Sequence, residues 1–500
     1  MFFPRGWNPI FHSAMSLLRE TAKGVAWTTA ATIVRSVVSL LQVAILTRFL
    51  EKSDFGIVAI ATLFLGFTQI FLDLGISAGI MHKQDTTPQQ YSSLFWLNII
   101  TGTLLTTVLC ACSPLVAKAY KEPELVRIIS LLSFTVFFSA LGSQHRTLQQ
   151  KKMRFMYIAI IEIVAAVLSL TLAIVLAVNG VGIYSLVFAN LFQTALSGLL
   201  FLGIGLYKDR NISFHFNFRE TYDYLKIGVF SIGSHVLDYF SRELDIFIIS
   251  ATLGKEVTGV YSLCKKLVVA VYGAVTPIVT KVITPIFAIL QQEKERIKQV
   301  YYDVVESLAL INMPIYCLIA VFSMGILKYL YGDQYTDGAL VLAFTALTYG
   351  VNTTGNPVGS LQIALGRTDT GFYWTIIRII ATSIAIFIGA QFSVDAIALS
   401  LLVLNFVVNP LFWRITIKPL IGGSYGSYFK VSLLVCLVIM SASSPLYFLF
   451  HNWTDVFSCL AIGGLYVMAF VVILFFLYPS SYLSRMVKEK FLSHLHFIKK

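Results

Sequence analysis

The sequence predicts an all-α polytopic membrane protein of about fourteen transmembrane helices, and three observations carry that prediction. The 500 residues are 57% hydrophobic and only 12% charged, about half the charged fraction of a soluble protein. The mean hydropathy is +0.79. Apolar stretches of about 20 residues recur along the chain, and each is long enough to cross a bilayer. The net charge of +12 does not indicate nucleic-acid binding, because Lys and Arg lie in short loops between these stretches.

Charged and turn residues bound the apolar stretches and so define the predicted spans. The spans lie at roughly 24–50, 55–80, 91–117, 125–147, 156–178, 182–207, 224–252, 257–284, 301–326, 338–364, 372–392, 395–417, 428–450 and 455–478. No connection exceeds about twenty residues, so we expect no soluble domain at either face. Any function must therefore be built from the membrane helices.

One predicted span carries ionisable residues near its middle. Gly228 to Leu253 is apolar enough to cross a bilayer, but a polar stripe runs along it at steps of 4, 3, 4 and 3: Ser231, His235, Asp238, Arg242 and Asp245. These steps place all five residues on one helix face. An ionised group at the centre of a membrane helix costs about 2.5–3.5 kcal/mol, so such a face lines a bundle interior or a wet cavity.

The same stripe occurs 203 residues earlier in the chain, as Thr28, Thr32, Arg35, Ser39 and Gln42. Beyond it, Leu50 and Gly56 align with Leu253 and Gly259. The shared pattern predicts an internal parallel repeat. We expect an N-terminal extension at 1–15, of which a start at Met15 would remove the first 14 residues. A six-helix lobe at 16–220, a second six-helix lobe at 221–420, two further helices at 421–480 and a basic tail at 481–500 would follow.

Basic residues predict the topology. With the N-terminus in the cytoplasm, the cytoplasmic segments hold twenty-one Lys and Arg and the outside loops hold five. The positive-inside rule then places both termini in the cytoplasm.

Two residues of the first lobe are candidates for chemistry. Arg35 lies on the polar stripe without an acid four residues away. Such a cation indicates an anionic ligand, and the alternative is a structural ion pair with Asp73 or Glu162. Asp73 either couples a cation or gates transport, or it is a structural residue at a helix end.

In the second lobe, Asp238 and Arg242 are spaced to pair on one helix. This leaves Asp245 to accept H⁺ or Na⁺, while a lone histidine such as His235 is more often a structural residue than a titrating one. Lys265 and Arg378 would add to a cationic cavity lining. The sequence contains no P-loop, HExxH or GxSxG motif, so we expect neither an enzyme nor a cofactor. The six cysteines fall within spans and indicate no disulfide framework or metal site.

The segment from Tyr239 to Ser250, followed by Leu253-Gly and Gly259-Val-Tyr-Ser, resembles the central signature of bacterial Wzx-type polysaccharide flippases. The segments that begin at Leu50, Asp73 and Pro285 resemble the WzxC-like branch of that family. Glu243 stands where the family usually shows Asn. The resemblance implies membership of the multidrug/oligosaccharidyl-lipid/polysaccharide (MOP) exporter superfamily, with two six-helix lobes that open alternately to each face.

The resemblance also implies a cargo and partners. The cargo is an undecaprenyl-diphosphate-linked oligosaccharide, moved from the cytoplasmic to the periplasmic leaflet of the inner membrane. The partners are membrane lipids, a polysaccharide polymerase and chain-length machinery. The cargo's diphosphate supplies a role for Arg35, because the anion must be neutralised while it crosses. The alternatives are a cation-coupled drug exporter of the same superfamily and, from another class, a membrane polymerase or transferase.

Overall fold

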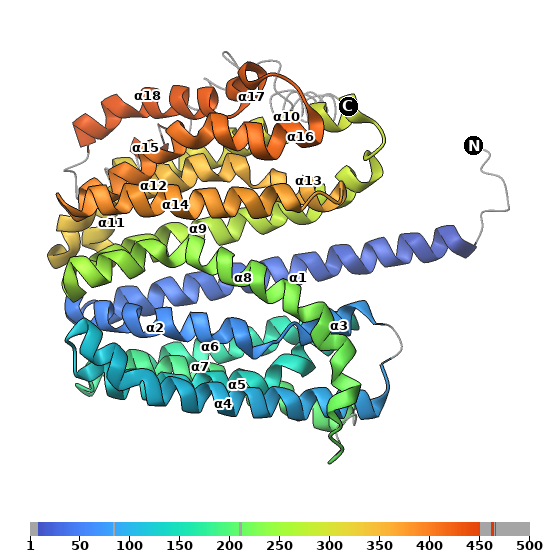
Figure 1. The fold of residues 1–500 in the computed structure, drawn as a ribbon. Helices are drawn as coiled ribbons and strands as arrows, with labels where there is room; N and C mark the ends of the chain where they lie inside the picture. Colours follow the sequence, from blue (N-terminus) through green and yellow to red (C-terminus); the bar gives the residue numbers. More distant parts are fainter. Residues whose placement is uncertain (1–8, 84–85, 210–212, 451–461, 465, 467–500) are drawn as a thin grey trace, which may run out of the picture. The chain divides into compact units, whose positions relative to one another are not determined.

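The computed structural model describes residues 9–83, 86–209, 213–450, 462–464 and 466, and the side chains of most of them. Helices make up almost all of this part of the chain, and it contains no strand (Figure 1). Ten of the described helices are long and apolar enough to cross a membrane. The fold class is therefore the predicted one.

The predicted count of about fourteen spans is not reached within the described residues. The helix α8 (Phe218–Thr252) is not among the ten, and it carries four ionisable residues between 238 and 245. The last predicted span, 455–478, and the tail at 481–500 lie almost entirely outside the described residues.

The chain forms two compact units. Unit 1 comprises Met1–Leu50 and Ile57–Tyr239, and unit 2 comprises Glu51–Gly56 and Phe240–Lys500. The division after residue 239 falls inside α8, about one turn beyond the middle of that helix. The sequence predicts a lobe boundary at 220.

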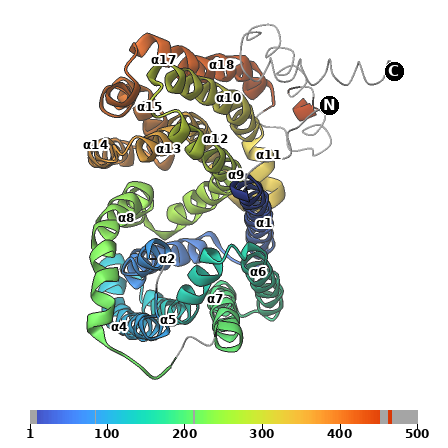
Figure 2. The ribbon, with the colours of Figure 1, turned by 90° about the vertical axis from the view of Figure 1, so that its right-hand side faces the viewer.

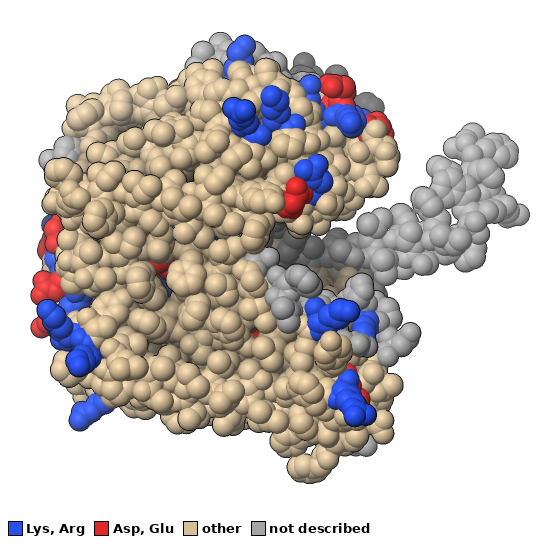
Figure 3. All heavy atoms as spheres, in the orientation of Figure 1, with Lys and Arg blue, Asp and Glu red and all other residues tan. Residues whose placement is uncertain are grey.

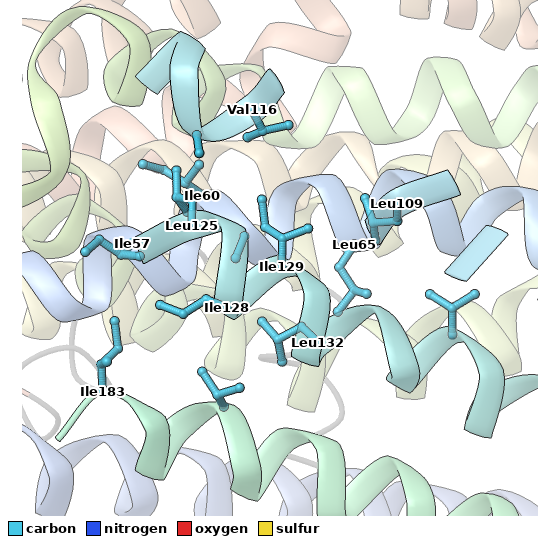
Figure 4. Close-up of a cluster of buried hydrophobic side chains, with 14 of the residues drawn as sticks. Ile57, Ile60, Leu65, Leu109, Val116, Leu125, Ile128, Ile129, Leu132 and Ile183 are labelled. Atoms are coloured by element: carbon cyan, nitrogen blue, oxygen red, sulfur yellow. The ribbon is translucent and has the colours of Figure 1, made fainter. Parts of the chain in front are cut away.

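Unit 1 contains the first half of the helices. These are α1 (Pro9–Leu46), most of α2 (Lys52–Leu72), α3 (Ile76–His82), α4 (Pro88–Tyr120), α5 (Glu124–Lys151), α6 (Phe155–Val178), α7 (Tyr184–Ile204) and the start of α8. The helix α5 packs against α4 and α7, and α6 packs against α1 and α7 (Figure 2). Aliphatic side chains from α2, α4 and α5 form the core between them (Figure 4).

The helices α5 and α7 approach closely through two glycines. A Cβ atom at Gly198 would lie 2.2 Å from the carbonyl oxygen of Phe138, and one at Gly142 would lie 2.7 Å from the Cα of Gly198. Small residues at membrane helix crossings permit such backbone approach.

The predicted span 55–80 is wrong as a single helix. It is broken between α2 and α3, where Leu74 and Gly75 have φ angles of 45° and 71°. These left-handed conformations end the helix, and glycine adopts them at little cost.

Unit 2 contains the remaining helices. These are α9 (Gly254–Ile289), α10 (Lys294–Val321), α11 (Ser323–Leu330), α12 (Ala339–Asn352), α13 (Pro357–Ala364), α14 (Asp369–Ala390), α15 (Val394–Phe412), α16 (Lys418–Ile421), α17 (Tyr425–Val431) and α18 (Leu433–Phe450). The helix α10 packs against α12 and α18, α9 against α12 and α13, and α14 against α15.

The predicted span 338–364 is also wrong as one helix. It breaks at a 3₁₀ turn, Thr353–Gly355, because Pro357 cannot continue the hydrogen bonding of α12.

The segment Glu51–Gly56 is held in unit 2 by a reciprocal glycine contact. A Cβ at Gly56 would lie 1.8 Å from the carbonyl oxygen of Lys255, and one at Gly259 would lie 2.0 Å from that of Lys52. The two contacts are related by the offset of the predicted repeat, since 255 − 52 and 259 − 56 are both 203. Lys52 Nζ also lies 2.6 Å from Asp337 Oδ2.

The face of the molecule in Figure 3 is mostly uncharged. Most of the Lys, Arg, Asp and Glu side chains visible in this view lie in a few groups toward its margins, and a broad area without charged side chains lies between them. This distribution is typical of a protein that spans a bilayer.

Candidate functional site

The first site is a cluster of three charged side chains from three helices of unit 1. Arg35 of α1 places Nη1 3.0 Å from Glu162 Oε2 on α6. Arg146 of α5 places Nη2 and Nε each 2.9 Å from Glu162 Oε1. The two arginines therefore share one carboxylate, each on a different oxygen. We call Arg35, Arg146 and Glu162 the arginine cluster.

The arginine cluster carries one more positive charge than negative. Its glutamate is 12% exposed, while the side chains of Arg35 and Arg146 are 39% and 45% exposed. The Nε of Arg35 is buried, and no described residue accepts a hydrogen bond from it. Each guanidinium has five N–H donors, and one shared carboxylate cannot accept hydrogen bonds from all of them, so several N–H groups remain available to another acceptor. The cluster can therefore accept a further anion.

Arg35 forms the ion pair that was the structural alternative to ligand binding, and its partner is Glu162, one of the two residues predicted for that pair. Arg146 is not among the predicted site residues, since it lies at the very end of the predicted span 125–147. The helix α5 continues to Lys151, so Arg146 lies within it, more than a turn from its end. The remaining stripe residues of α1 include Thr28 and Thr32, whose hydroxyls donate to the carbonyls of residues four positions earlier. Ser39 and Gln42 are half-buried on the same helix.

Asp73 lies at the break between α2 and α3. Its Oδ1 accepts hydrogen bonds from Ser77 Oγ at 2.5 Å and from Ser77 N at 3.2 Å, and Ser77 Oγ lies 2.9 Å from Thr147 Oγ1 on α5. A carboxylate at the start of a helix satisfies free N–H groups. This is the geometry of the structural alternative, and the coupling role stays a prediction.

The second site joins α8 to α9 in unit 2. Lys265 of α9 is only 6% exposed. Its Nζ donates to the carbonyl oxygen of Arg242 at 2.6 Å, to Asp245 Oδ1 at 2.8 Å and to Glu243 Oε2 at 3.2 Å. Tyr261 donates its hydroxyl to Asp245 Oδ2 at 2.7 Å. We call Lys265, together with the Arg242 carbonyl oxygen and the carboxylates of Glu243 and Asp245 that accept from it, the lysine cage.

The lysine cage changes the interpretation of Lys265. The sequence predicts a cation that lines a cavity, but a buried ammonium with three donors and three acceptors has none left for a ligand. Glu243, which lies off the polar stripe, is one of those acceptors. The predicted residues Asp245 and Lys265 are thus brought together, in a pairing that sequence spacing does not reveal.

The other predicted residues are more exposed. His235, Asp238 and Arg242 have exposed side chains on α8, and Arg378 has one on α14. The side chain of Ser231 lies outside the described residues. Among the residues that the structure describes, no group of three or more His, Cys, Asp or Glu side chains could hold a metal ion.

A segment at 213–217, here called the strap, connects to the start of α8 and lies on α4. Ser92 Oγ lies 2.5 and 2.9 Å from the carbonyl oxygens of Ser213 and His215, within hydrogen-bond distance of both. The Trp96 ring stacks on Phe214 with centroids 5.7 Å apart. The strap lies outside the predicted spans, and the side chain of Phe214 is 98% exposed.

Glu220 closes the strap onto α4. Its Oε2 accepts from Ser93 Oγ at 2.7 Å, and its Oε1 lies 3.0 Å from His215 Nε2. The hydroxyl of Ser93 and the imidazole of His215 hold the pKa of Glu220 below its usual value of 4.5. The ionised carboxylate is therefore the form that holds the strap.

Comparison with known proteins identifies a family. The model of a family described as "Polysaccharide biosynthesis protein" matches residues 45–340, more than half of the chain. The teichuronic acid biosynthesis protein TuaB of Bacillus subtilis is 27% identical over 423 residues, which cover 84% of this chain and 87% of that protein. The lipopolysaccharide biosynthesis protein WzxC of Escherichia coli is 26% identical over 417 residues, covering 83% and 84%.

Solved structures show the same fold. The lipid II flippase MurJ in an inward closed conformation has a TM-score of 0.72 at 13% identity, covering 90% of this chain and 99% of MurJ. An inward-facing multidrug resistance MATE family transporter of the MOP superfamily has a TM-score of 0.60 at 14% identity, covering 82% and 96%. At these identities the likenesses show a shared fold. The ten apolar helices indicate a multi-pass membrane protein.

Proposed function

We propose, since this chain belongs to the polysaccharide biosynthesis protein family, that it moves a lipid-linked oligosaccharide across a bacterial inner membrane. The cargo would be an undecaprenyl-diphosphate-linked repeat unit, carried from the cytoplasmic to the periplasmic leaflet, with both termini of the protein in the cytoplasm. The names of the relatives, which include a succinoglycan biosynthesis transport protein, ExoT of Rhizobium meliloti, support transport rather than catalysis.

The arginine cluster is the observation that carries this proposal. An anionic headgroup cannot enter the membrane interior without a compensating charge. Two guanidinium groups on neighbouring helices match a diphosphate, because arginine binds phosphate oxygens through paired N–H donors. Glu162 holds both groups in place when no cargo is bound, and its single charge leaves one positive charge for the anion.

Alternating access supplies the movement. We propose the predicted lobes, 16–220 and 221–420, as the bodies that move, and Asp73, Asp238 and Asp245 as residues that couple to H⁺ or Na⁺ or set the balance between inward and outward states. The repeat unit would then pass to a polymerase and its chain-length machinery.

Substitutions in the arginine cluster test the proposal. Arg35→Ala and Arg146→Ala each remove a charged hydrogen bond to the diphosphate, worth about 1.5–3 kcal/mol, so transport should fall about 10- to 100-fold. Glu162→Gln removes the competing charge and should bind cargo more tightly but release it more slowly. The assay is flipping of a fluorescent undecaprenyl-diphosphate-linked saccharide by purified protein in liposomes.

The control is Arg367→Ala, which removes an arginine whose partner is Asp369, 2.9 Å away in a connection outside the spans. It should transport normally. Cells that depend on Arg35→Ala should accumulate lipid-linked repeat units at the cytoplasmic leaflet with normal protein levels. Normal flipping by both single arginine variants would reject the diphosphate role, and export of cationic drugs instead would favour the drug-exporter alternative.

A further inference from the structure

The lysine cage has the composition of a cation site. Around the ammonium of Lys265 lie a backbone carbonyl oxygen and two carboxylate oxygens, at 2.6, 2.8 and 3.2 Å. Carbonyl and carboxylate oxygens are the ligands that hard metal cations prefer. In membrane transporters, such oxygens from helix ends and side chains coordinate Na⁺. Here a side chain of the protein fills the position.

The charge of the cage requires a cation. Asp245 and Glu243 are 14% and 32% exposed, and together they carry two negative charges against the one of Lys265. The hydroxyl of Tyr261 donates to the Asp245 oxygen that faces away from the ammonium and so fixes the orientation of that carboxylate. Glu243 is partly exposed and lies beside the guanidinium of Arg242, whereas Asp245 is mostly buried and has Lys265 as its ion-pair partner. Without a cation at this position, the Asp245 carboxylate would lose that partner, which is strongly destabilising.

We propose that the ammonium of Lys265 is a tethered substitute for a free monovalent metal cation. The unit that holds the cage therefore binds no Na⁺ there, which leaves H⁺ rather than Na⁺ as the coupling ion for Asp245. Removal of the lysine amine opens a site that Na⁺ can occupy. The existence of the cage depends only on these contacts. The consequence for transport, that this position needs no external Na⁺, rests on the proposed function.

Thermal unfolding of the purified full-length protein in detergent tests the proposal. Wild type, Lys265→Ala and Lys265→Gln are each titrated with NaCl against choline chloride at constant ionic strength. The midpoint of wild type should not differ between the salts. The midpoints of the two variants should start lower in choline and rise by several degrees with NaCl, and the rise should saturate. Lys265→Gln keeps the side-chain volume, so the test does not depend on folding of the alanine variant.

Two controls make the result specific to the cage. Lys265→Arg retains a tethered cation, so its unfolding midpoint should not differ between NaCl and choline chloride, as for wild type. In the double variant Lys265→Gln/Asp245→Asn the cage has one carboxylate less, and the Na⁺ response should disappear.

The proposal is overturned if the unfolding midpoints of the variants are the same in NaCl as in choline chloride at every concentration. It is also overturned if Na⁺ raises the midpoint of wild type as much as it raises theirs. Binding of radioactive ²²Na⁺ to the same samples should agree with the unfolding result. Neither measurement involves transport. A failure here is thus distinct from a failure of the flippase proposal, which the liposome assay reads.

Discussion

The glycine crossing of α5 and α7 permits a quantitative prediction. A Cβ at Gly198 would lie 2.2 Å from the Phe138 carbonyl oxygen, about 1 Å inside ordinary contact distance, and that oxygen belongs to a backbone that cannot rotate away. Gly198→Ala must therefore push the two helices apart. Overpacking of this kind costs about 1–3 kcal/mol of unfolding free energy.

A matched control lies on the same helix. A Cβ at Gly203 would meet no described atom within 4 Å, so Gly203→Ala should leave the stability unchanged or raise it by up to about 1 kcal/mol, through the lower chain entropy of alanine. The assay is equilibrium unfolding in mixed detergent micelles. Equal stabilities for the two variants would refute the reasoning, because both make the same chemical change and only the crossing distinguishes them.

Two further predictions concern the strap. Because the folded-state pKa of Glu220 is lowered, its contribution to strap stability is present above the unfolded value near 4.5 and is lost as the pH falls through the folded value. The ratio of hydrogen-exchange protection at 213–222 between wild type and Glu220→Gln should therefore be largest at neutral pH and should approach one as the pH falls below the lowered pKa of Glu220. A ratio that is constant across this range would contradict the role of the carboxylate. Phe214→Trp should be quenched more by lipids brominated near the headgroup than by lipids brominated deep in the chain, because exposed aromatic rings prefer the interface. Equal quenching at both depths would contradict this placement.

Much of the fold could be predicted because hydropathy and helical periodicity are local properties of the chain. The apolar stretches of α4, α5 and α6 identify those helices directly. The breaks could not be predicted in the same way. At Leu74 and Gly75 an apolar window hides a left-handed turn, although Asp73 and Gly75 together are a helix-boundary signal. At 353–356 the signal was Pro357, and the surrounding apolar residues outweighed it.

The candidate site was less predictable, for a physical reason. Arg35 and Asp245 could be found because an ionisable residue in an apolar stretch stands out in the sequence. Their partners were harder to predict, because each lies on another helix. For Arg35 the sequence offered Asp73 and Glu162 as alternatives, and the structure pairs it with Glu162, 127 positions later. Lys265, 20 positions after Asp245, was not predicted as the partner of that residue. Only the packing of α1 on α6, and the seating of α9 beside α8, decides which charges meet.

The reciprocal contact of Gly56 with Lys255 and of Gly259 with Lys52 has a consequence for mutagenesis. In an interface between two identical subunits related by a twofold axis, residue i of one copy touches residue j of the other, and j touches i in return. The same reciprocity holds here between two segments of one polypeptide. A side chain added at either glycine would therefore meet a backbone carbonyl of the other segment, and neither segment can be enlarged without displacing its counterpart.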